Sequence, residues 1–363
     1  MGLARKFKRL TLLLIAAANL LVVMALLGCG YAGEVSPERH PTCEVLTLLF
    51  PIPLVLNAGF LIFWLIFHYK LALIPIAGFL LCASPVRHYC PLNLGKPAPA
   101  DGFKVMTLNA NIFHYNHDMA KLPNPCIEYL CHSGADIICL QEAHIHQNIK
   151  KLTNRLKEAY PYFEREQQHH HERVAVLSRY PIVRHELIEV DSRKNACAAF
   201  YIKMGADTLL MVNCHFESSK LSEKERDDFG DLVTRKSNVI DERSIVHKVM
   251  RMGRRHARQA DAVMAYIKKH RREGMSVMVC GDFNDTPLSY AHHVFARELT
   301  DCHTATANGP GFTHRAHGML VRIDHMFCSS DLQPYGCQID TKKEISDHYP
   351  IICTLKKRQN PKK

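Results

Sequence analysis

The stretch VMVCGDFNDTP, Val277 to Pro287, ends an apolar run in a group of oxygen-bearing side chains. Asp282, Asn284 and Asp285 come directly after Gly281, a residue that lets the chain turn sharply. Carboxylate and amide oxygens are the ligands that Mg²⁺ and other hard cations prefer. The stretch therefore predicts a metal-binding or catalytic site at the end of a buried strand, although a turn capped by an Asx side chain requires the same residue types.

Polar side chains stand at the ends of several other strand-like segments. They are Asn109 and Asn111 after VMTL, Glu142 after IICLQ, His215 after LLMVNC, Asp324 within VRIDHMF, and Asp347 and His348 before YPIICTL. Strand ends at one rim of a sheet can converge on a single cleft, with the strands as its rigid support. We therefore expect these side chains to gather with those of the Val277–Pro287 stretch.

The elements that must position these residues follow from the hydrophobic pattern after Phe103. Short apolar runs predict strands in FKVMTL, ADIICLQE, VAVLSRYPI, HELIEV, CAAFYIKM, TLLMVNCHF, VMVC, VRIDHMFC and PIICTL. Helical spacing is found in four segments: Met119–His132, a stripe from Ile145 to Leu156, Arg243–His270, and Tyr290–Glu298. Strands joined both directly and through helices predict an α/β fold with two mixed sheets face to face and helices outside.

Composition bears on the partners of the chain and on the role of its cysteines. The chain has 363 residues and a net charge of +11, of which +5 lies in residues 1–100 and +6 in the rest. This excess suits phosphate esters, nucleic acid or acidic lipid, and it equally suits plain solubility. Among fourteen cysteines, Cys139, Cys214, Cys280 and Cys353 lie in apolar strand contexts, which is typical of small core residues. The absence of a CxxC pair argues against a thiolate zinc site.

Three apolar runs fill most of the first ninety residues: Leu10 to Gly28, Val45 to Phe67, and Leu71 to Val86. A membrane span needs roughly 20 apolar residues, so the first two qualify and the third is short. The first run also has the basic start and apolar centre of a signal peptide. Its length and the runs that follow favour an uncleaved anchor with two to three transmembrane helices.

The basic N-terminal residues predict a cytoplasmic N-terminus. The loop Glu34–Glu44, with three Glu, then falls outside and Lys70 inside. Three crossings place everything after Arg87 on the outer face, whereas two leave it in the cytoplasm. We expect three, although ten cysteines in the soluble part are unusual in an oxidising compartment. Cys90–Gly102, rich in Pro and Gly, predicts a linker.

Six motifs, in order, resemble the endonuclease/exonuclease/phosphatase superfamily: MTLNAN, LQE, SRYPI, GDFNDTP, RIDHMF and SDHYPI. The apolar segments before them resemble a membrane-anchored branch of bacterial members, which implies the bacterial inner membrane and a periplasmic catalytic domain. The resemblance implies a four-layered α/β sandwich. The predicted parts are a membrane anchor (1–89), a linker (90–102), a catalytic domain (103–357) and a basic tail (358–363).

The resemblance also implies roles for single residues. The expected ligands of Mg²⁺, with Mn²⁺ as the alternative ion, are Glu142, Asn109 and Asp347. The expected catalytic residues are Asp282, which orients or deprotonates the attacking water, Asn284, His348, His215 as a proton donor to the leaving oxygen, and Asp324, which fixes the His348 ring. Phosphate contacts are expected from Asn111, Asn284 and His348.

The predicted function is a membrane-anchored, divalent-metal-dependent phosphoesterase that hydrolyses a phosphodiester or phosphomonoester by in-line attack of activated water. The alternatives are a nuclease and a non-catalytic membrane scaffold on the same fold. Basic and aromatic residues are not interleaved, and a membrane anchor suits a lipid substrate, so lipid or small phosphoesters rank above nucleic acid. The complete set of site residues argues against the scaffold.

Four further features have a structural and a functional interpretation. His325 stands where members of the superfamily commonly carry Tyr or Phe, as a packing residue with a polar tip. HHHE at 169–172 suggests a solvated loop rather than a metal site. Arg251, Arg254, Arg255 and Arg258 suggest a solvated helix face or an anionic lipid contact. The polar segment Phe216–Asp231 suggests a surface loop or a rim of the cleft.

Overall fold

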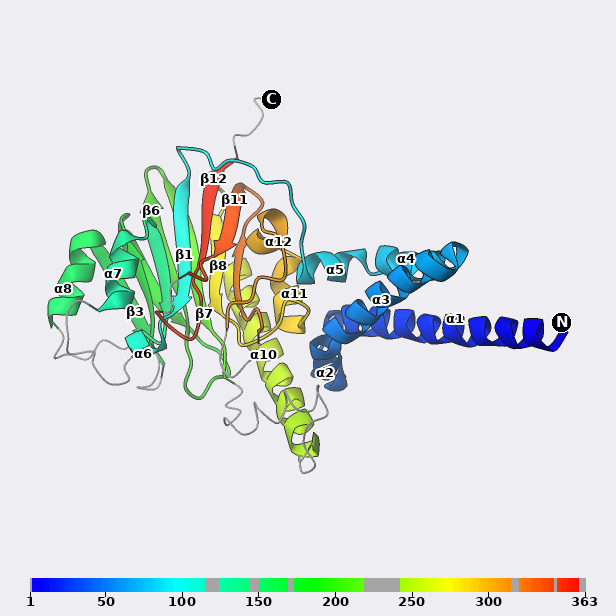
Figure 1. Ribbon diagram of the computed structural model, residues 1–363. Coiled ribbons are helices and arrows are strands. Elements are labelled where there is room, and N and C mark those ends of the chain that lie inside the picture. The colour runs from blue at the N-terminus through cyan, green and yellow to red at the C-terminus, as the bar shows by residue number, and fades with distance from the viewer. Residues whose placement is uncertain are drawn as a thin grey trace.

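Two six-stranded sheets lie face to face at the centre of the computed structural model, and helices cover their outer faces (Figure 1). The structure describes residues 2–114, 124–143, 150–168, 173–218, 242–314, 320–342 and 345–358. Both sheets contain parallel and antiparallel pairs. The expected four-layered α/β sandwich is confirmed.

The two sheets have similar layouts. The first has the order β11-β12-β1-β2-β4-β3, with β1 Phe103–Asn109, β2 Ile137–Gln141, β3 Tyr162–Gln167, β4 Arg173–Ser178, β11 Leu332–Ile339 and β12 Ile351–Lys357. The second has the order β5-β6-β7-β8-β10-β9, with β5 Ile182–Ile188, β6 Cys197–Met204, β7 Asp207–His215, β8 Ser276–Asp282, β9 Thr300–Asp301 and β10 Asp324–Cys328. Each sheet has a parallel pair near its centre, β1 with β2 and β7 with β8.

Apolar residues on both faces of the central strands explain the layers. Val105 and Met211 pack into the core between the sheets, whereas their neighbours Met106 and Leu210 pack outward beneath the helices. Side chains of a strand alternate between its faces, so a continuous apolar run requires cover on both sides. The cysteines at 139, 214, 280 and 353 are fully buried here, as their sequence contexts predict.

The outer helices differ in length between the two faces. They are α6 Asn111–His114, α7 Pro125–His132, α8 Lys150–Ala159, α10 Glu242–His270, α11 Tyr290–Ala296 and α12 Cys302–Thr306. α7 and α8 pack on the first sheet, and α10 and α11 on the second. The predicted helices Arg243–His270 and Tyr290–Glu298 agree with α10 and α11 within a few residues. α8 is described from Lys150, so the Ile145 end of the predicted stripe lies outside the described residues.

The N-terminal region extends from one side of the sandwich as a group of helices (Figure 1). Its elements are α1 Gly2–Tyr31, the short 3₁₀ helices η1 Ala32–Glu34 and η2 Tyr69–Ala72, and α2 Thr42–Leu49, α3 Pro51–Phe67, α4 Leu73–Leu81 and α5 Ala83–Tyr89. α1 is long and apolar enough to cross a membrane. The second and third apolar runs are bent, by 41° between α2 and α3 and by 68° before α5, so up to three spans are present if each bent pair counts as one.

Candidate active site

The strand register brings the predicted site residues to one rim of the sandwich. His215 at the end of β7 pairs with Asp282 at the end of β8, and Asp282 also pairs with Asp324 at the start of β10. In the other sheet, Asn109 ends β1 and lies beside the last residue of β2, directly before Glu142. The two parallel pairs therefore end at the same place, where the facing sheets can share one site.

Asn109 joins the two sheets through its amide. Its Nδ2 donates to Oε1 of Glu142 at 3.3 Å and to Oδ2 of Asp282 at 3.0 Å. The same two carboxylates face Nε2 of His215, at 3.9 and 3.7 Å. Burial, together with the nearby Asp324 carboxylate, raises the pKa of Asp282. Two carboxylates held this close together form a suitable place for a cation.

His348 lies between two carboxylates. Its Nδ1 is 2.8 Å from Oδ2 of Asp324, and its Nε2 is 3.8 Å from Oδ2 of Asp282. Burial alone would lower the pKa of His348, but the carboxylates of Asp324 and Asp282 outweigh it and raise the pKa to about 10. At neutral pH the ring is therefore an imidazolium whose Nε2–H is available to an anion.

His215 is charged differently from His348, although both are buried. Burial lowers the pKa of His215 to about 4, because the attraction of Asp282 is too weak to compensate. An uncharged ring can donate one hydrogen bond, but it is a poor source of a proton at neutral pH. A lowered pKa suits hydrogen-bond donation by His215, and its donation of a proton to the leaving oxygen stays a prediction.

Three of the predicted site residues have left-handed backbone, which is costly for side chains other than glycine. Their φ angles are +41° for Asn111, +50° for Glu142 and +51° for Asn284. Asn284 is held in this conformation by two hydrogen bonds, from its backbone N–H to Oδ1 of Asp282 (2.8 Å) and from Nδ2 to the carbonyl of Phe216 (3.0 Å). Such strain persists only where surrounding contacts enforce it, and it is concentrated at functional sites.

A pocket opens at this rim, lined by Asn109, Glu142, His215, Asp282, Asn284, Asp347 and His348. Asp324 lies behind His348 rather than on the pocket surface, and Asn111 does not line the described part of the pocket. Burial opposes ionisation of Asp347, but His348 and His314 outweigh it and lower its pKa. The site residues expected from the sequence are thus gathered at one rim, with Asn111 at its margin.

The pocket is rich in carboxylates. Five line it, from Glu44, Glu142, Asp282, Asp285 and Asp347, and none of its described lining residues is Lys or Arg. Possible ligand atoms of His314, Asp347 and His348 lie close together, as do those of Asp282, Asp324 and His348. A His348 ring protonated on both nitrogens has no lone pair for a metal, so the carboxylate oxygens are the donors that fit a hard divalent cation. The amide nitrogen of Asn109, rather than its oxygen, faces the carboxylates, so Asn109 would have to turn its amide to act as a ligand.

Sequence reasoning missed several residues of the pocket. Glu44, from α2, and His256, from α10, both line it. Outside the lining, Ser346 donates to the carbonyl of Asn109 at 2.7 Å. His256 offered a weak signal, because it is a polar residue within the apolar stripe of a predicted helix. Glu44 offered none, since its place depends on how the N-terminal helices dock.

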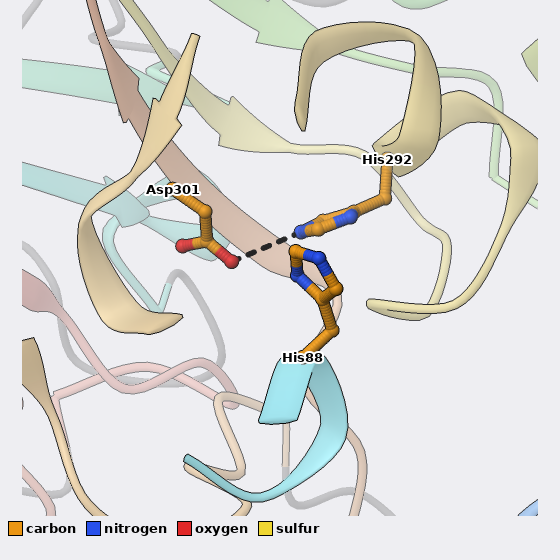
Figure 2. Close-up of side chains that lie close together, drawn as sticks. All are labelled: His88, His292 and Asp301. Carbon is orange, nitrogen blue, oxygen red and sulfur yellow. Dashed lines mark hydrogen bonds and ion pairs between the residues drawn. The ribbon is translucent and has the colours of Figure 1, made fainter. Parts of the chain in front are cut away.

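A second group of His and Asp side chains lies where α5 meets the sandwich: His88, His292 and Asp301 (Figure 2). Nε2 of His292 is 3.2 Å from Asp301, whose carboxylate also accepts from the backbone N–H groups of His303 and Thr304. The buried guanidinium of Arg322 lies close by and, together with His292, outweighs burial and lowers the pKa of Asp301. These contacts leave the carboxylate satisfied, so the group is a polar joint between α5 and the sandwich.

Most of the other features noted in the sequence lie outside the catalytic pocket or outside the described residues. His325 is buried, packs on Phe283 at a ring distance of 5.2 Å and contacts the carbonyl of Asp285, as a packing residue with a polar tip would. Arg255 and Arg258 form ion pairs with acidic neighbours that include Asp191. HHHE at 169–172 and most of the segment 216–231 lie outside the described residues.

Comparisons with known proteins agree with this geometry. A model of the endonuclease/exonuclease/phosphatase family matches residues 106–348, and one described as a domain of unknown function matches residues 11–89. No curated protein matches the chain.

Solved structures resemble the fold at low sequence identity. The human Nocturnin catalytic domain with bound sulfate anion is 15% identical, with a TM-score of 0.53, and the match covers 72% of this chain and 97% of that one. Truncated Caenorhabditis elegans TDP2 is 17% identical with a TM-score of 0.46, covering 71% and 99%. A family protein from Bacteroides thetaiotaomicron is 16% identical with a TM-score of 0.46, covering 72% and 98%.

Proposed function

Because the chain belongs to the endonuclease/exonuclease/phosphatase family, we propose that it is a membrane-anchored phosphoesterase that uses a divalent cation, Mg²⁺ or Mn²⁺. It hydrolyses a phosphodiester or phosphomonoester. The observation that carries this proposal is the meeting of Glu142, Asp282 and His348 around a single pocket.

The charge of the pocket supports a cation as part of the site. Glu142, Asp282 and Asp347 bring carboxyl groups to the place where a phosphate ester would bind, and none of the described lining residues is a Lys or Arg that could offset them. A divalent ion held by Glu142 and Asp347, with Asn109, would offset both the carboxylates and the charge that builds on the phosphate oxygens. The sulfate in the Nocturnin structure, a tetrahedral dianion like phosphate, is consistent with anion binding on this fold.

Side chains of the chain itself supply the other functions. Asp282 orients the attacking water and accepts its proton, for which a raised pKa is suitable. The imidazolium of His348 donates from Nε2 to a phosphate oxygen, while Asp324 fixes its ring from the other side. Nδ2 of Asn284 donates one hydrogen to the carbonyl of Phe216, and its second hydrogen is proposed to bind a phosphate oxygen. His215 donates a hydrogen bond, and Asn111 contacts the substrate from the margin.

The arrangement of the N-terminal helices supports an anchor whose catalytic domain lies outside the cytoplasm, in the periplasm of a bacterial inner membrane. α1, α3 and α4 pack together, and the N-terminus and the α3–α4 connection both lie at the end away from the sheets (Figure 1). That end carries Arg5, Lys6, Lys8 and Arg9 together with Lys70. Clustered basic residues mark the cytoplasmic side.

The cysteines are compatible with an oxidising compartment. All are free, and of the ten in the sandwich only Cys131 is not fully buried. Burial raises the pKa of Cys126 to about 12, and it raises the pKa of Cys139 as well. Because the thiolate is the reactive form, these two thiols resist oxidation, whereas hydrogen bonds with Cys302 and Cys337 lower the pKa of the buried Cys353 thiol. A reporter fused to the C-terminus tests the placement, and activity of a cytoplasm-only reporter would contradict it.

The chemistry is tested with a soluble substrate, bis(4-nitrophenyl) phosphate, and purified full-length protein. We expect hydrolysis in Mg²⁺ or Mn²⁺, loss of hydrolysis in excess chelator, and recovery when the ion is restored. Hydrolysis that persists undiminished in excess chelator would contradict the proposed mechanism, and the absence of hydrolysis of any phosphate ester would favour a non-catalytic scaffold.

A further inference from the structure

We propose that helix α2 of the anchor forms a wall of the catalytic pocket and that this wall receives the hydrocarbon part of a lipid phosphate ester. The inference rests on the proposed phosphoesterase function and names its substrate class. Its starting point is that two residues of α2, Glu44 and Leu48, line the same pocket as Asp282 and His348.

α2 lies directly on α10, with a glycine at the crossing. A Cβ added at Gly253 would lie 2.4 Å from Cγ of Glu44 and 2.8 Å from its Oε2. No side chain fits in that space, so the two helices are held at close range. The wall is therefore a packed part of the structure rather than a loosely tethered segment.

The wall also borders the catalytic loop. Glu44 of α2 and Asp285 of that loop line the same pocket. Asp285 in turn is 3.1 Å from Nδ1 of His256, whose Nε2 is 2.8 Å from the carbonyl of Glu217. Asp285 lies three residues after Asp282, so α2 bears on the loop that holds the proposed base.

The pocket is more apolar on the side formed by this wall. Leu48 from α2 and Val249 and Met252 from α10 line it, and Val321 and Ile323 add apolar surface beside β10. Leu48 and Val249 are half-buried, whereas Met252 is 7% exposed. A pocket with carboxylates and histidines together with apolar side chains matches a substrate with a phosphate and a hydrocarbon chain.

The wall lies next to the region proposed to enter the membrane. Leu48 precedes by three residues the first residue of α3, Pro51, and α3 exposes apolar side chains such as Val55 (69%) and Ile66 (69%). A soluble protein rarely leaves so much apolar surface uncovered. The pocket is thus positioned at the boundary between membrane and water, where the phosphate of a lipid also lies.

A nucleic-acid substrate suits the pocket less well. Binding of a polynucleotide depends on Lys and Arg contacts to many phosphates, and the described residues that line the pocket include neither. A lipid phosphate ester has a single phosphate, which the cation would bind, and a hydrocarbon part, which the wall would contact.

The test measures inhibition of bis(4-nitrophenyl) phosphate hydrolysis by ethyl, butyl and octyl phosphate, with full-length protein held in an amphipathic polymer. Burial of methylenes in the wall predicts that the inhibition constant falls about three- to four-fold for each methylene that is buried. A constant that is the same for all three inhibitors would overturn the lipid inference while leaving the phosphoesterase intact.

Two variants test whether the dependence of inhibition on alkyl chain length arises from contact with the wall. Leu48→Asn and Met252→Gln are expected to reduce the ratio of the ethyl and octyl phosphate inhibition constants at least about ten-fold, which is 1.4 kcal/mol of lost apolar contact. Leu48→Met should keep the ratio, because it preserves apolar volume. The matched control is Leu46→Asn on the same helix, since Leu46 is 38% exposed and does not line the pocket. An unchanged ratio in both wall variants would overturn the inference.

Direct substrates complete the experiment. The wild-type protein is expected to hydrolyse phosphatidylglycerol in mixed micelles with a higher kcat/KM than a single-stranded oligonucleotide. The opposite order would assign the pocket to nucleic acid and overturn the inference. Failure to hydrolyse both bis(4-nitrophenyl) phosphate and the monoester 4-nitrophenyl phosphate would instead remove the phosphoesterase proposal itself.

Discussion

Nδ1 of His348 lies 2.8 Å from Oδ2 of Asp324, and both side chains are almost fully buried. This contact fixes the tautomer and the orientation of the ring, because Nδ1 must carry a proton to donate to the carboxylate. The opposite nitrogen then faces the pocket and Asp282. Asp324 therefore helps to keep the His348 ring protonated, although Asp324 does not itself line the pocket.

Asp324→Asn is expected to lower kcat by roughly 10²-fold or more, because the ring loses the partner that keeps it charged and oriented. A role in folding alone would not change the titration of the ring. In metal-free protein, the His348 resonance should titrate near pH 10 in the wild type and at clearly lower pH in the variant. Identical titration in the two proteins would contradict the assigned role.

The same pair predicts a pH dependence of stability. The pKa of His348 in the folded protein, about 10, lies above its ordinary value of 6.5. Its contribution is therefore complete below about pH 6.5 and is lost as the pH rises toward 10. Thermal unfolding of metal-free protein should show a decline over this window that is smaller in Asp324→Asn. A decline of the same size in both proteins would assign the effect to other groups.

Asp282→Asn separates catalysis from folding. Burial and the nearby Asp324 raise the pKa of Asp282, which means that the ionised form is unfavourable in the metal-free fold. A neutral amide of the same shape should leave the melting temperature unchanged or higher, while kcat falls by about 10³-fold because the base is lost. The control is Asp101→Asn, whose side chain is 69% exposed. Activity near that of the wild type would remove Asp282 from the mechanism.

Metal binding can be followed without turnover. At an Mg²⁺ concentration 100 times the dissociation constant, binding stabilises the fold by about 2.7 kcal/mol. For a domain of this size we expect the melting temperature to rise by about 5–10 °C. Glu142→Gln should require at least about ten-fold more Mg²⁺ for the same rise, whereas Glu273→Gln, in an exposed turn, should not. Equal titrations would show that Glu142 is not a ligand.

The central strands and the site residues were predictable because each carries a local signal. Buried strands such as β2 and β8 are continuous apolar runs, and the polar residues at their ends are conspicuous against them. The three strands that the sequence did not indicate all lie at sheet edges, β3 and β11 in the first sheet and the two-residue β9 in the second. β3 carries charged residues on an exposed face, and β11 contains Pro334 and Gly336, which are tolerated at an edge.

What the sequence could not reveal is the docking of the anchor. Glu44 belongs to an apolar helix and Asp285 to a catalytic loop, and no local pattern connects them. Their contact depends on long-range packing, in which Leu288 joins an apolar cluster with Leu26, Phe50 and Cys82 of the N-terminal helices. The role of the N-terminal region as a wall of the pocket, rather than a tether, follows only from this packing.

Gly33→Ala tests whether that docking positions the catalytic loop. A Cβ at Gly33 would lie 1.9 Å from the carbonyl oxygen of Leu288, three residues after Asp285, so the two backbones must separate. We expect a loss of about 1–3 kcal/mol in stability and a fall in kcat of up to about 100-fold as the loop shifts. The control is Gly28→Ala in α1, where the added Cβ meets no atom within 4 Å. If both variants retain wild-type kcat and melting temperature, contact with the N-terminal helices does not set the geometry of the catalytic loop.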